Sequence, residues 1–291
     1  MSAPLTMAQA QVQPSGATPK LPRLPTYFLS HGGGPWPYMD GPFRAAFGQL
    51  EASLKRIPVE LGGVKPRAVL MISGHWEAES FRVMSSAHPG MVYDYYGFPP
   101  HTYTIKYPAP GDPALAQRVA ALIAAAGLPT ALDEQRGFDH GTFSTLYPMY
   151  PEADVPVVQV AMHASYDPAA HLALGRALAP LRDEGVLIIG SGFSFHNLRL
   201  FGPQALEPSG AFDAWLQHSL VDLPPQQRSE ALLHWDRAPA ARIAHPAEDH
   251  LIPLLAAVGA AEDEVGQCIY HEDRFRGGVA ASSFRFGALP A

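Results

Sequence analysis

The chain has 291 residues, of which 47% are hydrophobic and 16% charged, so it is long and apolar enough for one large globular domain, or at most two. Its formal net charge of −7 leaves no basic footprint, and no nucleic-acid partner is expected. A single cysteine, Cys268, excludes an intrachain disulfide, and no apolar run approaches the ~20 residues that a membrane helix needs, so no membrane partner is expected either.

The N-terminal segment has neither the charged start nor the apolar block of a secretory signal. We expect residues 1–24 to be a flexible leader and residues 25–291 to form one folded domain, because no linker interrupts the apolar sequence there. The single cysteine suits a reducing compartment, and the cytoplasm is the expected location.

The first predicted strand begins at Tyr27 and ends at Ser30, and His31 and three glycines, residues 32–34, follow it directly. Glycine tolerates positive φ and close approach of other groups, so this run indicates a tight turn. In open α/β sheets ligands bind at the carboxyl ends of the strands, which is where the turn displays its histidine. The apolar spacing of residues 43–56 then predicts a helix.

A second strand is predicted at residues 68–73, an uninterrupted apolar run typical of a strand buried on both faces. It stops at Gly74 and His75, which repeats the order of apolar run, small residue and histidine. Residues 82–86 predict another strand, and the loop at residues 93–103 is crowded with aromatic residues and prolines.

Asp-Pro pairs open two further predicted helices, at residues 112–126 and 167–182, with the aspartate as N-cap and the proline at the first helical position. Strands are predicted at residues 155–160 and 186–190, and the second of these is again an apolar run typical of a buried strand.

Residues 210–258 are predicted to be mostly helical, and a polar-apolar alternation at residues 282–286 predicts a closing strand. Strands that alternate with helices of these lengths indicate βαβ crossovers. The sequence therefore predicts an α/β fold, a single domain in which helices flank a central, largely parallel sheet.

Three of the 13 histidines, His31, His75 and His196, follow predicted strands at or near their carboxyl ends. Because those ends lie along one edge of a parallel sheet, we expect the three imidazoles to converge. Neutral imidazole suits Zn(II) and Fe(II), and two or three ligands with open positions suit catalysis. One such histidine alone is more often structural, but three in glycine-rich settings favour a metal site.

The remaining histidines have weaker settings. His140 lies in a predicted turn at residues 137–141, and His250 lies at the predicted start of a helix. His163 also follows a strand, but it has no glycine beside it, and we interpret it as structural. Surface exposure is expected for the others, which are His88, His101, His171, His218, His234, His245 and His271.

Other chemistries fit less well. The glycine run after His31 lacks the spacing of a phosphate-binding loop. Ser191 lies between two glycines but without the spacing of a nucleophile elbow. Cys268 has no evident activating neighbour, which argues against a nucleophilic role.

Six motifs follow one another along the chain, and they are the apolar-His-Gly start at His31, Ser73-Gly-His-Trp76, Tyr107-Pro-Ala-Pro-Gly111, Gly137-Phe-Asp-His-Gly141, Gly192-Phe-Ser-Phe-His-Asn197 and Glu248-Asp-His-Leu-Ile-Pro-Leu254. Together they resemble the class III extradiol ring-cleaving dioxygenases of the LigB-like superfamily, with the DOPA 4,5-dioxygenase-like proteins as the most similar branch. The resemblance runs in order from about Tyr27 to Phe286.

The resemblance implies that His31, His75 and His250 are metal ligands and that His140 is a catalytic histidine of the pocket. His196 would stand beside the metal, either as a catalytic acid and base or as a fourth ligand in a zinc-filled form. The implied metal for activity is non-haem Fe(II), and Zn(II) is possible in the same site. The implied fold is an α/β sandwich around a mixed sheet.

The reaction implied is the insertion of O2 into a catechol-type, DOPA-like aromatic diol, with ring opening to a muconic-semialdehyde-type product. Residues 25–291 would be the catalytic domain, in a monomer or small homo-oligomer. Candidates to line its pocket, each of which could equally be an ordinary core residue, are Trp36, Tyr38, Tyr95, Tyr96, Phe98, Phe193 and Phe195.

The chain departs from the family pattern in two places near His31 and His75. A third glycine follows His31 where many relatives have His-Gly-Ser-Pro, and glycine precedes His75 where alanine is common. Both departures bear on substrate preference.

Other interpretations stay open. Glu248 or Asp249 could supply an oxygen ligand beside or instead of His250, as in sites with two histidines and a carboxylate. The same ligands could serve a zinc hydrolase with Glu248 or Asp249 as its base, or a metal-binding protein without catalysis.

Overall fold

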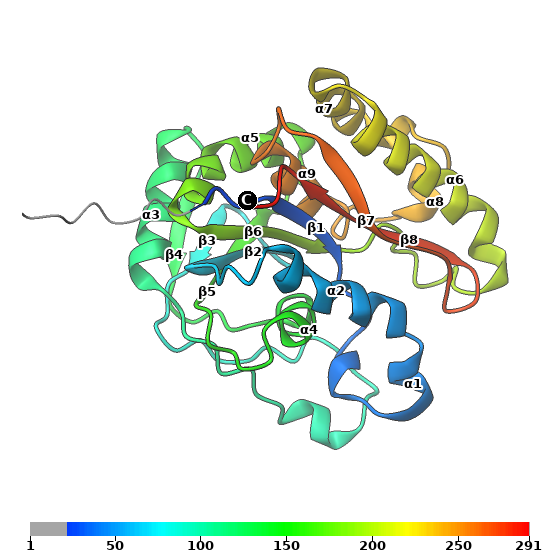
Figure 1. Cartoon of the computed structure of the whole chain (residues 1–291), viewed down its shortest axis with the longest axis horizontal. Helices are drawn as coiled ribbons and strands as arrows, with labels where there is room; N and C mark the ends of the chain where they lie inside the picture. The colour runs from blue at the N-terminus through cyan, green and yellow to red at the C-terminus, as the bar shows by residue number, and fades with distance from the viewer. Residues whose placement is uncertain (1–21, 291) are drawn as a thin grey trace, which may run out of the picture.

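An eight-stranded sheet runs through the computed structural model, which describes residues 22–290 (Figure 1). The order across the sheet is β4-β3-β5-β2-β6-β1-β8-β7. The strands are β1 (Thr26–Ser30), β2 (Ala68–Ala78), β3 (Phe81–Met84), β4 (Thr130–Asp133), β5 (Val157–His163), β6 (Val186–Gly192), β7 (Gly266–Phe275) and β8 (Val279–Phe286).

The sheet is mixed but largely parallel. Neighbours β5, β2, β6 and β1 all run parallel, whereas β8 is antiparallel to both β1 and β7, and β3 is antiparallel to β5. This confirms the predicted fold class, a single α/β domain with helices on a central sheet.

Helices cover both faces of the sheet (Figure 1). One face packs against α9 and α5, and the other against α4 and α2, while α6 packs on β8. The helices are α1 (Gly41–Ala45), α2 (Gly48–Glu60), α3 (Pro113–Ala125), α4 (His140–Met149), α5 (Pro168–Leu178), α6 (Leu206–Gln217), α7 (Pro225–Leu233), α8 (Ala241–Ala244) and α9 (Ile252–Gly259).

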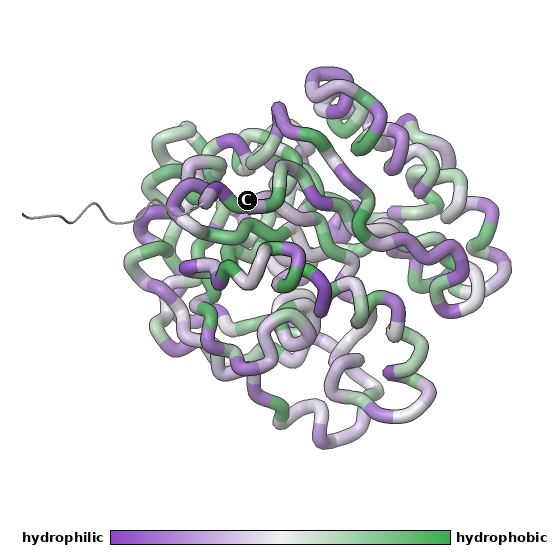
Figure 2. Tube along the Cα trace, in the orientation of Figure 1, coloured by the Kyte–Doolittle hydropathy of each residue, from purple (hydrophilic) through white to green (hydrophobic). Residues whose placement is uncertain are grey.

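The central strands are apolar because both of their faces are covered. Every residue of β1 and β6 is buried, and Figure 2 shows the hydrophobic colour concentrated along these inner strands. A parallel strand between two helical layers has no side that meets water, so an uninterrupted apolar run is its sequence signature. This is why the strands at the centre of the sheet could be predicted.

Two strands at opposite edges of the sheet were not predicted. β7 carries exposed polar residues such as His271 and is interrupted by register shifts, and β4 is a half-exposed segment of four residues. Edge strands avoid apolar surface because it would invite pairing with other chains. The sequence pattern of a polar edge strand therefore resembles that of a loop, and no strand was predicted there.

The predicted helix starts are confirmed, and the predicted ends are less accurate. The Asp112 carboxylate accepts from the Leu115 N–H, and the Asp167 carboxylate from the Ala169 N–H, as N-caps do. The second of these helices ends at Leu178 and continues as a 3-10 turn, residues 179–184. The helix predicted at residues 43–56 is instead two helices, α1 and α2.

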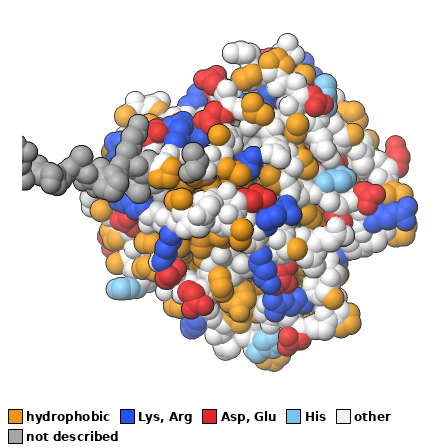
Figure 3. All heavy atoms as spheres, in the orientation of Figure 1, with side chains coloured by type: hydrophobic (Ala, Val, Ile, Leu, Met, Phe, Trp, Pro, Cys, Tyr) orange, Lys and Arg blue, Asp and Glu red, His pale blue; other side chains and the backbone are white. Residues whose placement is uncertain are grey.

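Residues 1–21 of the expected leader lie outside the described part of the chain. Leu24 is buried, and its N–H donates to the Arg182 carbonyl at 3.2 Å. The face drawn in Figure 3 mixes acidic and basic side chains. Within residues 22–290, none of the helices has the length and apolar character that a membrane crossing requires.

Candidate metal centre

The predicted histidines meet at the carboxyl ends of three adjacent strands, β2, β6 and β1. His31 follows β1 directly, and its N–H donates to the carbonyl of Gly192, the last residue of β6, at 3.0 Å. His250 precedes α9, and its carbonyl accepts from the Phe193 N–H at 3.0 Å. Gly192 and Phe193, at the end of β6, thus hold the backbone of His31 and His250 in place by hydrogen bonds.

His75 lies within β2 and does not follow it, which corrects the predicted strand end. The pairing of β2 with β6 stops at Ser73, but the strand continues to Ala78 with a register shift against β5 between Ile72 and Glu77. In β2 the apolar run ends at Ser73, close to where the strand stops being buried on both faces, but the backbone remains extended to Ala78.

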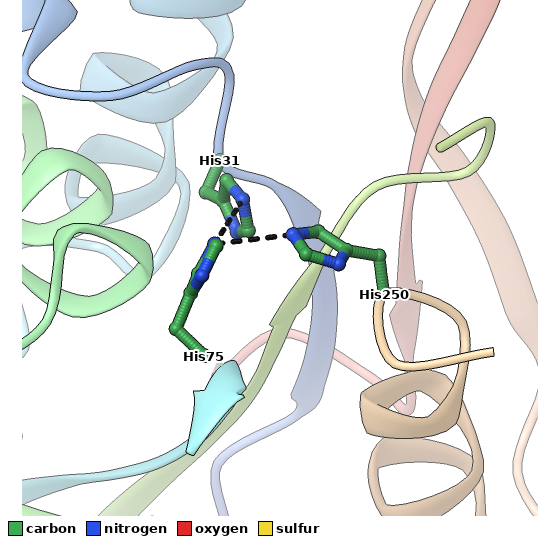
Figure 4. Close-up of side chains that lie close together, drawn as sticks. All are labelled: His31, His75 and His250. Atoms are coloured by element: carbon green, nitrogen blue, oxygen red, sulfur yellow. Dashed lines mark hydrogen bonds between the residues drawn. The ribbon is translucent and has the colours of Figure 1, made fainter. Parts of the chain in front are cut away.

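Figure 4 shows the imidazoles of His31, His75 and His250 pointing toward one another. The His75 Nε2 lies 3.2 Å from the His31 Nε2 and 3.1 Å from the His250 Nε2. His31 and His250 are almost fully buried, and their rings lie 5.0 Å apart between centroids. Three segments distant in sequence therefore present the same ring nitrogen to one point.

The outward-facing nitrogens show which tautomer each ring has. The His75 Nδ1 lies 3.2 Å from the Asp94 carboxylate, and the His250 Nδ1 lies 2.7 Å from the Asp249 carboxylate, so both Nδ1 atoms carry a proton. The Nε2 atoms of these two neutral rings are therefore unprotonated.

His31 reaches the same tautomer through a serine. The Ser191 hydroxyl donates its proton to the Gly141 carbonyl at 2.6 Å, so it accepts from the His31 Nδ1 at 3.1 Å. Burial lowers the pKa of His31 and His75 well below the usual 6.5 and that of His250 to about 4, and neighbouring imidazoles add to this effect. All three rings are neutral at pH 7.

Three bare Nε2 lone pairs thus face one another without a proton among them, which is unfavourable unless a cation lies between them. Two nitrogens bound to one metal ion at about 2.1 Å lie roughly 3.0–3.4 Å apart when the angle between them is about 90–110°. The two observed separations, 3.1 and 3.2 Å, fall in this range. The donor set of His31, His75 and His250 fits a metal such as Zn(II) or Fe(II).

His140 is the first residue of α4, which corrects the predicted turn. The fully buried Asp139 caps this helix by accepting from the Thr142 N–H at 3.1 Å, and Arg136 donates to the same carboxylate at 2.7 Å. The helix start carries the His140 ring to 3.9 Å from the His75 ring, measured between centroids.

Asp94 links His140 to the histidine cluster, and no sequence motif pointed to it. One of its carboxylate oxygens accepts from the His140 Nδ1 at 2.9 Å and from the His140 N–H at 3.1 Å, and the other faces His75. Burial raises the pKa of Asp94, but the hydrogen bonds from His140 outweigh it, and the net pKa is lower than usual. With its Nδ1 bonded to the ionised carboxylate, His140 keeps its Nε2 unengaged by Asp94, and His140 lines the cavity.

His196 lies against His250, on one side of the three histidines. Its ring stacks on the His250 ring with centroids 3.4 Å apart and planes 14° apart, and its Nδ1 lies 3.8 Å from the Asp249 carboxylate. It is partly exposed, unlike His250. His196 is therefore the histidine of this group that lies toward the surface.

The two carboxylates next to His250 have other partners. The Glu248 carboxylate forms an ion pair with Arg242 at 2.8 Å, and Asp249 orients the His250 ring. Their contacts favour His250 over either carboxylate as the inward-facing donor.

A cavity of about 590 Å³ opens directly over the histidines. Four of the seven predicted aromatic residues line it, and they are Tyr95, Tyr96, Phe98 and Phe193. The other three do not line it: Trp36 and Phe195 are fully buried in the core, and Tyr38 packs on Tyr147. Residues of the wall that the sequence did not reveal include Phe47, Phe201, Phe275, Asp94 and Arg276.

The glycines after His31 have different reasons to be glycine. Gly32 and Gly34 have φ of +81° and +56°, and a Cβ on Gly34 would lie 2.6 Å from the Phe98 ring. Gly33 has ordinary φ, and a Cβ there would meet only Phe47, at 3.9 Å. The turn requires Gly32 and Gly34, whereas Gly33 leaves free space at the wall of the cavity.

Two histidines expected at the surface are buried, and that prediction was wrong for them. His171 accepts from the His163 N–H at 3.1 Å and donates to the Asp167 carbonyl at 2.7 Å, and His245 lies 3.1 Å from the Ser194 carbonyl. Exposure is confirmed for the other five, His88, His101, His218, His234 and His271.

Known proteins resemble this chain over most of its length. A family model described as the catalytic LigB subunit of aromatic ring-opening dioxygenase matches residues 25–287. A protein named dioxygenase tasH, from Hapsidospora irregularis, is 38% identical over 266 residues, which cover 85% of this chain and 81% of that protein.

Two proteins named 4,5-DOPA dioxygenase extradiol are also similar. The Beta vulgaris protein is 37% identical, with 90% of this chain and 96% of that protein covered, and the Escherichia coli K12 protein is 34% identical, with 82% and 85% covered. The crystal structure of the uncharacterized protein JW3007 from Escherichia coli K12 has a TM-score of 0.69 and 29% identity, and the match covers 91% of this chain and 100% of that one.

Proposed function

Because the chain belongs to the family of catalytic LigB subunits of aromatic ring-opening dioxygenases, we propose that it is an Fe(II)-dependent extradiol dioxygenase of catechol-type, DOPA-like substrates. In this proposal residues 25–291 are the catalytic domain. The observation that carries it is the convergence of three unprotonated Nε2 atoms, from His31, His75 and His250, at the floor of an aromatic cavity.

The proposed metal ligands are the Nε2 atoms of His31, His75 and His250. Fe(II), when bound there, would supply the redox chemistry that lets a catechol react with O2. Zn(II) fits the same three nitrogens, but it has no redox chemistry, so a zinc-filled protein is expected to bind catechols without opening them.

His140 is the proposed base for a catechol hydroxyl. Its Nδ1 is committed to Asp94 at 2.9 Å, so Nε2 is the nitrogen that takes the proton. The Asp94 carboxylate stabilises the imidazolium that forms, and it holds the ring in the required tautomer. His140 can then return this proton to the ring-opened product.

His196 is the proposed second proton carrier. It is partly exposed and stacked on His250, so it can exchange protons between solvent and the site, and in a zinc-filled form it could serve as a fourth ligand. Over the whole reaction, the carbon–carbon bond next to the diol breaks and both oxygen atoms of O2 enter the product. The catechol itself supplies the electrons.

The aromatic walls hold the substrate ring and exclude water. Tyr95, Phe98 and Phe193 offer flat apolar surface on the sides of the cavity, and Tyr95 lies edge-on to His140 with ring centroids 5.9 Å apart. An aromatic diol can pack against these rings while its hydroxyls reach the histidines.

The test is reconstitution without air. Protein purified anaerobically is loaded with Fe(II) or Zn(II) and mixed with a panel of catechols and O2, and oxygen uptake and the visible spectrum are recorded. We expect oxygen uptake and a new yellow chromophore in the Fe(II) sample alone. If no catechol consumes oxygen, the proposal is wrong.

A zinc hydrolase is less well supported by the contacts. Such an enzyme needs a carboxylate base near the metal that is free to take a proton, whereas Glu248 is paired with Arg242 and one oxygen of Asp249 is bonded to His250, with the other 3.8 Å from the His196 Nδ1. Hydrolysis of an ester panel by the Zn(II) sample, without oxygen uptake by the Fe(II) sample, would favour that alternative.

A further inference from the structure

Among the described residues that line the cavity over the histidines, Arg276 is the only lysine or arginine. It lies at the tip of the β7–β8 hairpin, directly after Phe275, which is buried and also lines the cavity. Phe275 packs against Phe47 and Phe193 with ring centroids 5.4 Å apart in both cases. The hairpin tip is thus anchored in the aromatic wall and holds its cation at the cavity.

The guanidinium of Arg276 is held by rings. Its central carbon lies 5.1 Å from the centre of the Phe43 ring and 5.7 Å from that of Phe47, distances at which a cation is attracted to a ring face. Attraction of this kind uses none of the guanidinium N–H groups, and they remain available as donors.

No carboxylate within residues 22–290 lies close enough to Arg276 for an ion pair. The two acidic residues of the cavity wall, Asp94 and Asp249, each accept a hydrogen bond from a histidine, and neither forms an ion pair with Arg276. Some other arginines, such as Arg176 with Glu262, have acidic partners, and Arg274 on the same hairpin has none within the described part of the chain but does not line the cavity. A cation in the wall of a cavity, with free donors and no internal partner, is arranged to meet an anion from outside.

A planar guanidinium matches a carboxylate, because two parallel N–H groups can donate to its two oxygens. The cavity of about 590 Å³ has room for an aromatic ring over the histidines and a short substituent beyond it. We propose that Arg276 binds a carboxylate on the side chain of the substrate and thereby makes the protein selective for acidic catechols. This inference rests on the proposed function for the position of the ring.

A catechol whose substituent is cationic or neutral would gain no binding energy from Arg276. An ammonium group near Arg276 would meet a like charge, and a neutral alkyl chain would leave the guanidinium donors without a partner. The expected order of preference at equal ring chemistry is therefore carboxylate over neutral over ammonium.

The test uses three catechols with side chains of similar length: 3,4-dihydroxyphenylpropionate, 4-propylcatechol and dopamine. With Fe(II) protein, kcat/KM for the acid should exceed that for the neutral catechol by about tenfold, the low end of what a charge-assisted contact provides, because Arg276 is exposed. Arg276→Gln should abolish this ratio, and Arg276→Lys should keep part of it.

Arg274→Gln is the matched control. Arg274 is an exposed arginine on the same hairpin, and it does not line the cavity. This variant should keep the full preference for the acid. A preference that is equal in the wild type and Arg276→Gln, or a wild type that does not prefer the acid, would overturn the inference.

Binding without turnover separates this inference from the proposed function. The dissociation constant of 3,4-dihydroxyphenylpropionate for the Zn(II)-loaded protein should rise about tenfold in Arg276→Gln and stay unchanged in Arg274→Gln. If no catechol consumes oxygen but this difference in binding is found, the dioxygenase proposal is wrong, and the proposal that Arg276 binds a carboxylate is supported. If the wild type, Arg276→Gln and Arg274→Gln bind this acid equally well, Arg276 does not bind its carboxylate, whether or not the protein is active.

Discussion

Replacing Asp94 with asparagine tests how the histidine cluster is held. The asparagine side chain would keep one oxygen, which can still accept from the N–H and Nδ1 of His140 as Asp94 does at 3.1 and 2.9 Å. The second oxygen becomes an NH2 group that faces the His75 Nδ1, now 3.2 Å from a carboxylate oxygen. Two donors would then point at each other, and His75 could relieve this only by moving its proton to Nε2, the nitrogen proposed to bind metal.

The size of the effect follows from the role of Asp94 in orienting His75. Groups that orient a metal ligand typically contribute 10- to 100-fold to metal affinity or activity, which corresponds to about 1.4–2.7 kcal/mol. Asp94→Asn also removes the charge that stabilises a protonated His140. We therefore expect metal affinity to fall about 10- to 100-fold, and kcat to fall further even when metal is saturating.

Metal affinity is measured by competition with a chelator, and kcat by oxygen uptake at saturating Fe(II). Asp222→Asn is a matched control, because Asp222 pairs with His218 at 3.2 Å in the same chemical combination but on the exposed surface. That control should leave both quantities unchanged. If Asp94→Asn binds metal as tightly as the wild type and turns over normally, Asp94 does not position either histidine.

Three other substitutions probe the ligands, a buried histidine and the packing around the site. His31→Ala should lose metal in elemental analysis, whereas His140→Ala should keep metal and lose oxygen uptake; full metal occupancy in His31→Ala would refute the ligand assignment. Burial lowers the pKa of His171 to about 4 from 6.5, so the unfolded chain takes up its proton first, and stability falls as pH drops through this interval. From pH 8 to pH 5 this histidine lowers the free energy of unfolding by about 2 kcal/mol. In urea titrations, the free energy of unfolding of His171→Gln should therefore fall by about 2 kcal/mol less over this pH range than that of the wild type. Gly192→Ala would place a methyl group 2.0 Å from the His250 carbonyl, and both melting temperature and metal content should fall; normal values would show that this backbone contact is dispensable.

Sequence reasoning succeeded where a local pattern has a single physical cause. The apolar run before His31 predicts a strand, and the glycines after it predict a turn, and both are found. Because parallel strands end at one edge, the approach of His75 to His31 could also be predicted without knowing the strand order. The order β2-β6-β1 then decides that they face each other across β6.

The groups that orient the histidines could not be predicted in this way. Asp94 lies in an aromatic loop, and nothing in the residues around it distinguishes it from an exposed acid. Ser191 was considered only as a nucleophile, whereas its hydroxyl orients His31. Arg276 belongs to a hairpin with a polar edge strand that reads as a loop. These contacts join segments far apart in sequence, so they depend on the complete fold.

The two departures from the family pattern have different physical consequences. A Cβ on Gly74 would lie 3.1 Å from the Asp249 carbonyl, tight enough to shift the segment that carries His250 by a few tenths of an ångström. Alanine at that position would therefore change the spacing of the proposed metal ligands. A Cβ on Gly33 would meet no atom closer than 3.9 Å, so a serine there would add its hydroxyl at the cavity wall. The glycine at position 33 keeps that part of the wall without a side chain, so under the proposed function it would bear on substrate preference, whereas Gly74 bears on how closely His250 approaches His75.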